Sequence, residues 1–506
     1  MKLTYKSLIF ITIIGIIQSF VSAQQVNTIY FMDNIPFRHN LNPAFQPTTY
    51  YYLSLPVVGL TQINVGNNSL TLKDVIYNYN GQTISFLHPV GGNIQRFYNT
   101  LRPTTVIHAD LETNLLSLGF RYKSAFWSFS LTEKIIGIVD IPKDFFLISL
   151  FGTREINNNS FNFTMLQSDV TAYTEAALGY SKKIDDKWST GIKLKYLLGS
   201  ANVSNTNKEL TMNAGVEKWI LKGEGVVNVS SPYQVIIGNN FQSISHTYPT
   251  SLSNLIKPSG LGVGIDLGFT YNPIKSLTFS AAIIDLGYIR WKTNAQNINY
   301  KIDYSFNGIG QIDSIKNLNS VQTIFDRITT GNSLVDSLIM AVQTASKVSK
   351  TYNSYTTFTP TKLNLGTEYS ILDQHLSFGL LSRTIFNKKT ISEEITASVN
   401  AKPTYWLNAT LSYSIFGGQF SSVGAGLGLR TGFVHWFVAA DYMAFQKATL
   451  SLRELSTSYW DIKMPIPYNT KSCNFSVGIN LVLDQIKPSI GLHKRKTKQD
   501  CNCNIK

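Results

Sequence analysis

The stretch KLNLGTEYSI, residues 362–371, decides the fold of this chain. Apolar and polar residues alternate along it. The two faces hold, in turn, Leu363, Leu365, Thr367, Tyr369 and Ile371, and Lys362, Asn364, Gly366, Glu368 and Ser370. A period of two is typical of a β-strand, because successive side chains point to opposite faces of a sheet. The stretch therefore predicts a strand with one apolar face and one polar face.

The same alternation recurs along most of the chain and predicts fourteen strands. These are residues 49–62, 108–122, 124–138, 172–182, 188–199, 261–271, 277–291, 362–371, 375–384, 394–401, 405–415, 423–430, 434–445 and 474–484. Short turns join the strands into pairs, whereas most connections between pairs are long. The longest are residues 63–107, 139–171, 200–260, 292–361 and 446–473. Alternating short turns and long loops are typical of outer-membrane barrels, whose short turns face the periplasm.

We therefore predict an all-β chain that forms a single transmembrane antiparallel β-barrel of about 14 strands. Its apolar face would meet lipid and its polar face would line a lumen. A soluble β-sandwich shows the same alternation with the apolar face buried. Strands of about 9 to 11 residues suit a bilayer crossing. Trp127, Trp188, Trp436 and Tyr405 fall where an interfacial aromatic girdle belongs, which also favours the membrane barrel.

The first 23 residues have the pattern of a secretory signal peptide. Lys2 and Lys6 precede the apolar run 8–17, and small residues end the segment at Ala23. The run is short for a membrane-spanning helix. We expect four parts: a signal peptide (1–23), an N-terminal plug or periplasmic segment (24–48), an outer-membrane barrel (49–484) and a basic periplasmic tail (485–506). Fourteen strands place both termini on the periplasmic side.

The composition argues against several classes of function. The net charge is +14, or +12 without Lys2 and Lys6, but only 15% of residues are charged. Apart from the run 493–498 the basic residues are dispersed, so no nucleic-acid partner is expected. The three cysteines, Cys473, Cys501 and Cys503, match neither a disulfide framework nor a metal motif. We expect no cofactor.

Two local patterns differ from the strands. Apolar residues recur at helical spacing between Val321 and Val342, which predicts one or two short amphipathic helices in the loop after Trp291. Glycines repeat on the polar faces of residues 262–268 and 424–428. These glycines are mid-strand and lack the strand–turn–helix context of a phosphate loop. They predict room in the lumen or relief of curvature instead.

Three segments resemble an uncharacterised outer-membrane family of Bacteroidota. They are the mature start, NTIYFMDNIP (27–36) followed by RHNLNPAF (38–45), and the segments VGNNSL (65–70) and DLGYIRW (285–291). Such proteins look like distant relatives of the FadL-type fourteen-stranded barrels and of the PorV-type barrels of type IX secretion. The resemblance implies an outer-membrane barrel.

In FadL-type proteins, residues before the first strand plug the lumen. By this resemblance, residues 24–48 are a plug candidate, with Tyr30, Phe31, Arg38 and Phe45 as its candidate residues. Left free, its aromatic side chains would be exposed to water, and packing into the bore would bury them. An ordinary N-terminal strand or a periplasmic docking segment are the alternatives. The candidates for lining the lumen are Lys193, Lys195, Asp266, Glu368 and Arg430.

Catalysis ranks last among the functions considered. His375 and Ser377 have the spacing of the His-x-Ser pair of outer-membrane phospholipases. A motif of three residues without its structural context is weak evidence, so we predict no catalytic site. The remaining histidines are isolated and predict no zinc site.

Two functions remain open from the sequence. The first is passage or binding of a small, lipophilic compound, with lipid and that ligand as partners. Passage would require a shift of the plug or a side opening, and Asp285, which disturbs the alternation after Ile283, marks a candidate break in the ladder. The second is an accessory barrel that holds partner proteins of a secretion or assembly machine.

Overall fold

The structure is a computed structural model of the full chain. It describes residues 27–80, 82–152, 160–215, 218–237, 244–247, 257–307, 346–387, 391–416, 420–443, 447–451, 463–467 and 471–483. Three predicted features lie outside these residues: the signal peptide, the helices within 321–342 and the basic tail.

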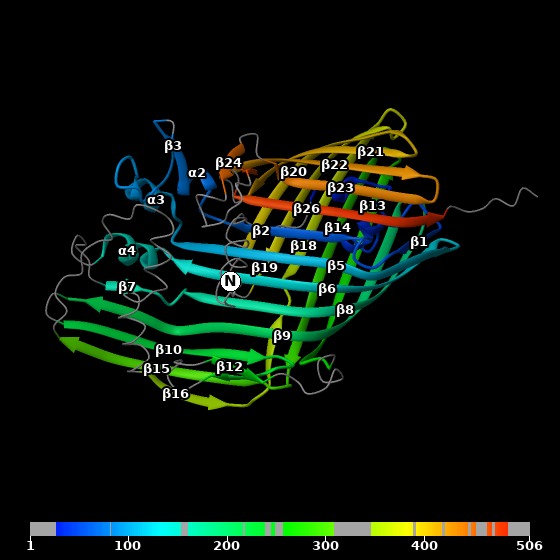
Figure 1. The fold of residues 1–506 in the computed structure, drawn as a ribbon. Helices are drawn as coiled ribbons and strands as arrows, with labels where there is room; N and C mark the ends of the chain where they lie inside the picture. Colours follow the sequence, from blue (N-terminus) through cyan, green and yellow to red (C-terminus); the bar gives the residue numbers. More distant parts are fainter. Residues whose placement is uncertain are drawn as a thin grey trace, which may run out of the picture.

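Fourteen antiparallel strand positions close into a barrel (Figure 1). In order around the barrel, they are β1 (Tyr51–Ser54) continued by β2 (Thr61–Asn67), β5 (Thr104–Tyr122), β6 (Ala125–Pro142), β8 (Gln167–Lys183), β9 (Trp188–Ala214), β13 (Gly260–Ile274), β14 (Leu277–Trp291), β17 (Tyr355–Phe358) continued by β18 (Thr361–Ile371), β19 (Leu376–Phe386), β20 (Ile391–Thr404), β21 (Leu407–Phe416), β22 (Phe420–Thr431), β23 (Val434–Met443) and β26 (Ser472–Leu483). The sheet closes where β26 pairs with β1, with Tyr52 opposite Val482. The predicted closed barrel of 14 strands is confirmed.

Apolar side chains cover the outside of the barrel and polar side chains its inside. On β21, Leu411 and Tyr413 are 63% and 47% exposed, whereas Thr410 and Ser412, which alternate with them, are buried. A sandwich would bury the apolar rows, so the observed arrangement rules it out. Trp127 and Trp436 lie on the outer face, and Tyr405 is exposed at a turn.

The two ends of the barrel differ. The short-turn end carries the tight connections, such as Lys123–Ser124 between β5 and β6. One turn lies later than predicted: β20 continues three residues further, to Thr404, and Tyr405 and Trp406 form the turn. The pairing of β20 with β21 shifts register between Ala401 and Thr404, so Pro403, which has no N–H to donate, falls outside the regular ladder.

The long-loop end contains more strand than the sequence predicted. β9 extends over 27 residues, and its far half pairs with β10 (Lys218–Ser230). β15 (Gln296–Asn307) and β16 (Ser346–Thr351) widen this sheet beyond the barrel (Figure 1). Sequence reasoning placed these residues in loops, because segments such as SNTNKE (204–209) lack an apolar–polar alternation.

Smaller elements complete the long-loop end. Around α3 (Ile94–Thr100) and α4 (Lys143–Phe151), Leu87, Phe97, Leu101 and Leu150 form a small core. The remaining elements are α2 (Leu72–Val75), β3 (Ile76–Tyr79), β4 (Gln82–Ser85), β7 (Ser160–Asn162), β11 (Gln234–Ile237), β12 (Ile244–Thr247), β24 (Lys447–Ser451) and β25 (Lys463–Pro467). Two 3-10 helices, η1 (Thr28–Phe31) and η2 (Pro36–Asn40), precede β1. Within the described part of the chain, no helix is long and apolar enough to cross a membrane.

Candidate functional site in the barrel lumen

The N-terminal segment, residues 27–48, lies inside the barrel. Tyr30, Phe31 and Phe45 are at most 9% exposed, and the Tyr30 hydroxyl lies 3.0 Å from Ser280 Oγ on the inner face of β14. The backbone N–H of Asn27 donates to Asp441 Oδ2 of β23 at 2.5 Å. Both the aromatic bulk and the backbone of this segment are therefore held by the inner wall.

Glycines on the inner wall make room for the N-terminal segment. At six of them an added Cβ would lie only 2.2–2.7 Å from an atom of the segment: Gly191, Gly268, Gly366, Gly379, Gly424 and Gly426. At Gly191 the obstacle is the backbone of Pro43, which cannot rotate away as a side chain could. The predicted role of lumen glycines in leaving room is confirmed at Gly268, Gly424 and Gly426.

Arg38 organises the part of the segment nearest the short-turn end. Its Nε donates to the Tyr30 carbonyl at 2.8 Å, its guanidinium pairs with Asp33, and the group lies 4.2 Å from the centre of the Phe45 ring. Burial alone would raise the pKa of the Asp33 carboxyl, but the charges of Arg38 and Lys402 outweigh it and lower that pKa. Arg38 thus joins two turns of the segment through ionic and cation–π contacts.

A second layer of contacts crosses the middle of the lumen. We call it the ionic layer, and it contains three lysines and three carboxylates from six strands: Lys134, Glu175, Lys195, Asp266, Asp285 and Lys362. Asp285 accepts from all three lysines, with Lys195 Nζ at 2.5 Å, Lys362 Nζ at 2.9 Å and Lys134 Nζ at 3.2 Å. Their side chains are at most 14% exposed. The equal numbers of positive and negative groups make burial of these charges tolerable.

Asp285 occupies a β-bulge. Its φ is +59°, and the pairing of β13 with β14 shifts register here, so that Ile265 faces Leu286 but Leu267 faces Ile283. The extra residue reverses which side chains point inward. Ile283 and Leu286 are both on the outside, whereas Ile284 and Asp285 between them are buried. The break in the ladder predicted at Asp285 is confirmed.

The strand beside this bulge is interrupted at Thr359 and Pro360, between β17 and β18. The Thr359 hydroxyl donates to the Asp285 carbonyl at 2.6 Å, and Pro360 has no N–H to offer a neighbour. β19 pairs with β18 only as far as the Thr361–Phe386 pair. Among the described residues β17 pairs with β14 alone, so its other edge has no strand beside it.

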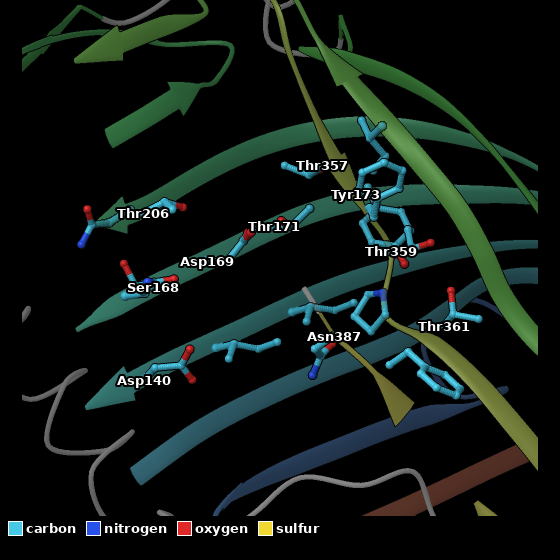
Figure 2. A pocket seen from close by; sticks show the side chains of 18 residues that line it. Asp140, Ser168, Asp169, Thr171, Tyr173, Thr206, Thr357, Thr359, Thr361 and Asn387 are labelled. Atoms are coloured by element: carbon cyan, nitrogen blue, oxygen red, sulfur yellow. Dashed lines mark hydrogen bonds between the residues drawn. The ribbon is translucent and has the colours of Figure 1, made fainter. Parts of the chain in front are cut away.

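A cavity of about 340 Å³ lies at this interruption (Figure 2). Three residues of its lining, Tyr173, Ile289 and Thr357, are buried on the inner side of the wall. Two others, Phe358 and Phe386, are 70% and 41% exposed and belong to outward rows. The lining of the cavity therefore includes residues from both sides of the wall. Lys134, Glu175 and Lys362 of the ionic layer are not part of the lining, but each lies one or two residues along the chain from a lining residue.

The structure places the predicted lumen residues at three heights. Lys195 and Asp266 belong to the ionic layer, and Lys193 donates to Asn40 of the N-terminal segment at 2.6 Å. Glu368 faces the lumen nearer the short-turn end and accepts from the Ser377 hydroxyl at 2.6 Å. Arg430 lies at the short-turn rim, where its Nε donates to the Gly432 carbonyl.

Sequence reasoning missed Lys134, Glu175 and Lys362 as partners of the predicted lumen residues. Each is a charged residue on the polar face of a predicted strand, and that is the signal that could have found them. Which of these charges meet across the lumen depends on the register of strands that are distant in sequence.

His375 and Ser377 each bond to other residues. His375 Nδ1 lies 2.8 Å from the Leu372 carbonyl of its own turn, while Ser377 bonds to Glu368 and Asn400. Within the described residues, no group of three or more His, Cys, Asp or Glu side chains is arranged to hold a metal ion.

Comparison with solved structures finds other barrels at low identity. The toluene transporter TodX of Pseudomonas putida is 10% identical with a TM-score of 0.37, over 92% of this chain and 96% of that one. A FadL homologue of Pseudomonas aeruginosa is 10% identical with a TM-score of 0.39, over 92% and 100% of the two chains. The translocator domain of the autotransporter NalP of Neisseria meningitidis is 8% identical with a TM-score of 0.29, over 86% and 89%. Likeness at this level does not assign a function.

A search of curated proteins finds no match. A family model does match, and it covers residues 43–441, most of the barrel and the end of the N-terminal segment. Its description is "Family of unknown function (DUF5723)". Because the match extends over more than half of the sequence, the chain belongs to this family.

Proposed function

We propose that this protein is an outer-membrane barrel that binds a small amphiphilic compound and lets it pass sideways through the wall. The closed sheet and its exposed apolar rows support the membrane location. A closed barrel pairs every strand, which satisfies backbone groups that hydrocarbon cannot. Export through a cleaved signal peptide near Ala23 completes this proposal.

The observation that carries the proposal is the cavity at the β17–β18 interruption. It joins buried inner residues such as Tyr173 to the outward residues Phe358 and Phe386. A ligand could thus leave the lumen, or enter it, between the free edge of β17 and the end of β19. Its volume of about 340 Å³ falls within the range of small-molecule sites.

The route along the barrel axis is blocked in the short-turn half. We infer that residues 24–48 act as a plug, because Tyr30, Phe31 and Phe45 fill the bore and Arg38 ties the segment together. The ionic layer adds a barrier on the side of its six strands, β6, β8, β9, β13, β14 and β18. A side route avoids both obstacles.

A bulky residue in the cavity tests the side route. Ile138→Trp fills the cavity from β6, and Ile135→Trp, on the lipid-facing side of the same strand, is the matched control. We expect Ile138→Trp to reduce uptake of a fluorescent alkyl amphiphile into proteoliposomes at least fivefold, while Ile135→Trp leaves it unchanged. Equal uptake by both variants would contradict the side route.

Deletion of residues 24–48 tests the plug separately. The inner faces of β20–β23 carry small side chains such as Ser412 and Thr396, so removing the segment leaves an open passage there. We expect higher permeability to small hydrophilic solutes, measured by liposome swelling. Unchanged permeability in a correctly folded deletion variant would count against a plug.

A second candidate function is that of an accessory barrel in a secretion or assembly machine. The sheet of β9, β10, β15 and β16 favours it, because this sheet projects beyond the barrel and has its own core around Trp219 and Met212 (Figure 1). A photo-crosslinker at the exposed Tyr352, next to β16, should then capture one stoichiometric partner protein. Similarity to type IX secretion barrels remains a prediction.

A further inference from the structure

The chemistry of the wall cavity indicates the kind of ligand that it accepts. Its described lining has 18 residues, and none of them is Lys, Arg or His. Six carry hydroxyl groups on Ser or Thr: Ser168, Thr171, Thr206, Thr357, Thr359 and Thr361. Gln167, Asn205 and Asn387 add amides, and Asp140 and Asp169 are the two charged residues.

An anionic ligand group does not fit this lining. It would lose its hydration and meet the carboxylates of Asp140 and Asp169. The nearest lysines belong to the ionic layer, where they form ion pairs with Glu175, Asp266 and Asp285. To use one of them, an anion would have to displace a carboxylate from a neutral network.

The lining is not arranged around a cationic ligand group either. The Asp169 carboxylate accepts from the Thr171 hydroxyl at 2.9 Å and from Asn202 Nδ2 at 2.9 Å. Both bonds are made to Oδ1, which ties this carboxylate to neighbouring side chains of β8 and β9. Hydroxyls and amides, which both donate and accept, suit an uncharged group with several hydroxyls of its own.

Polar side chains occur along the whole cavity, including Thr357, Thr359 and Thr361 at the strand interruption, whereas its exposed aromatic residues lie only there. Figure 2 shows Ser168, Asp169 and Thr171 on β8 and Thr206 on β9, away from the strand interruption. The apolar residues Phe358, Pro360 and Phe386 lie at the interruption, where the cavity reaches the outer face. A ligand with one polar and one apolar end therefore has a defined orientation.

We propose that the cavity binds an uncharged amphiphile with a hydroxylated head group. The head contacts the hydroxyls and amides of β8 and β9, and the alkyl chain lies against Phe358 and Phe386 toward the bilayer. This inference rests on the proposed side route and specifies its ligand class.

Three ligands with the same ten-carbon chain test the inference: decyl glucoside, decanoate and decyltrimethylammonium. Binding to the full-length protein in lipid nanodiscs is measured by calorimetry at pH 8 and below micellar concentrations. We expect decyl glucoside to bind at least tenfold more tightly than decanoate and more tightly than the ammonium compound. Stronger binding of decanoate or of the ammonium compound would overturn the uncharged head group.

Variants locate the binding. The double variant Ser168→Ala, Thr206→Val removes two hydroxyls without a charge change and should weaken glucoside binding about tenfold. Thr384→Val, on β19 outside the described lining, is the matched control and should have no effect. Glucoside affinity unchanged in the double variant would overturn the assigned head-group site.

The variant Ile138→Trp separates the two proposals. If Ile138→Trp abolishes binding of the ligand that binds best, the cavity is the binding site. The order of the three affinities then tests only the proposed head group. If none of the three ligands binds, or if Ile138→Trp leaves all binding intact, the side route itself fails and the inference fails with it.

Discussion

Replacing Asp285 by Asn tests whether the ionic layer is a balanced unit. Asn tolerates the positive φ of this position and preserves its size. The change removes one negative charge from a layer of three lysines and three carboxylates, which leaves one buried positive charge without compensation. An uncompensated buried charge costs about 3–5 kcal/mol, so we expect the free energy of unfolding to fall by about that amount.

The double variant Asp285→Asn, Lys362→Met restores neutrality, because Lys134 and Lys195 then face Glu175 and Asp266. We expect it to recover most of the lost stability. Glu224→Gln is the control, since the Lys208–Glu224 pair on the outer sheet is solvent-exposed and should contribute nothing measurable. The assay is urea unfolding in lipid bilayers, followed by tryptophan fluorescence. An Asp285→Asn variant as stable as Glu224→Gln, or a double variant no better than the single one, would refute charge balance.

Two further predictions concern the N-terminal segment. Gly191→Ala places a Cβ 2.2 Å from the Pro43 backbone and should destabilise the seated segment by about 1–3 kcal/mol, which would be seen as faster hydrogen exchange of residues 27–48. Gly264→Ala is the control, because its added Cβ would lie 3.5 Å from the nearest neighbouring atom, and it should not change the exchange. Equal exchange rates in the two variants would contradict the tight fit. Burial, with a smaller effect from Lys193, holds the pKa of His39 well below its usual value, so the released segment binds a proton that the seated one does not. Seating should therefore weaken below about pH 6.5, by about 1.4 kcal/mol at pH 5.5, in the same exchange measurement; a His39→Gln variant with the same pH dependence would contradict this assignment.

Strand number and facing could be predicted from sequence because each depends on local alternation. Residues 405–415, for example, show the period of two directly, and a short turn joins this strand to the strand before it. The long far half of β9 could not be predicted, because Ser204–Glu209 carries polar residues on both faces and its partner β10 provides the pairing.

The wall cavity was only partly accessible to prediction. The disturbance at Asp285 is visible in the sequence as a polar residue where an apolar one is due. The gap beside Asp285 depends on where β19 ends relative to β17. That position is set by the register between strands, which the alternation of residues within one strand does not determine. Likewise the charges of the ionic layer come from six strands, and only the folded barrel brings each of them within 4 Å of an opposite charge.

The central claim is that apolar rows face lipid while polar rows face an enclosed lumen. Nitroxide labels on β26, placed one at a time in a chain with its three cysteines replaced by serine, test it most directly. The outward positions are Val477, Ile479 and Leu481, and the inward positions are Ser476 and Asn480. In lipid vesicles, collision with dissolved oxygen should be high at the outward positions and low at the inward ones, with a period of two. Uniformly low oxygen collision along β26, or outward positions reached instead by a water-soluble nickel reagent, would contradict the lipid-facing barrel.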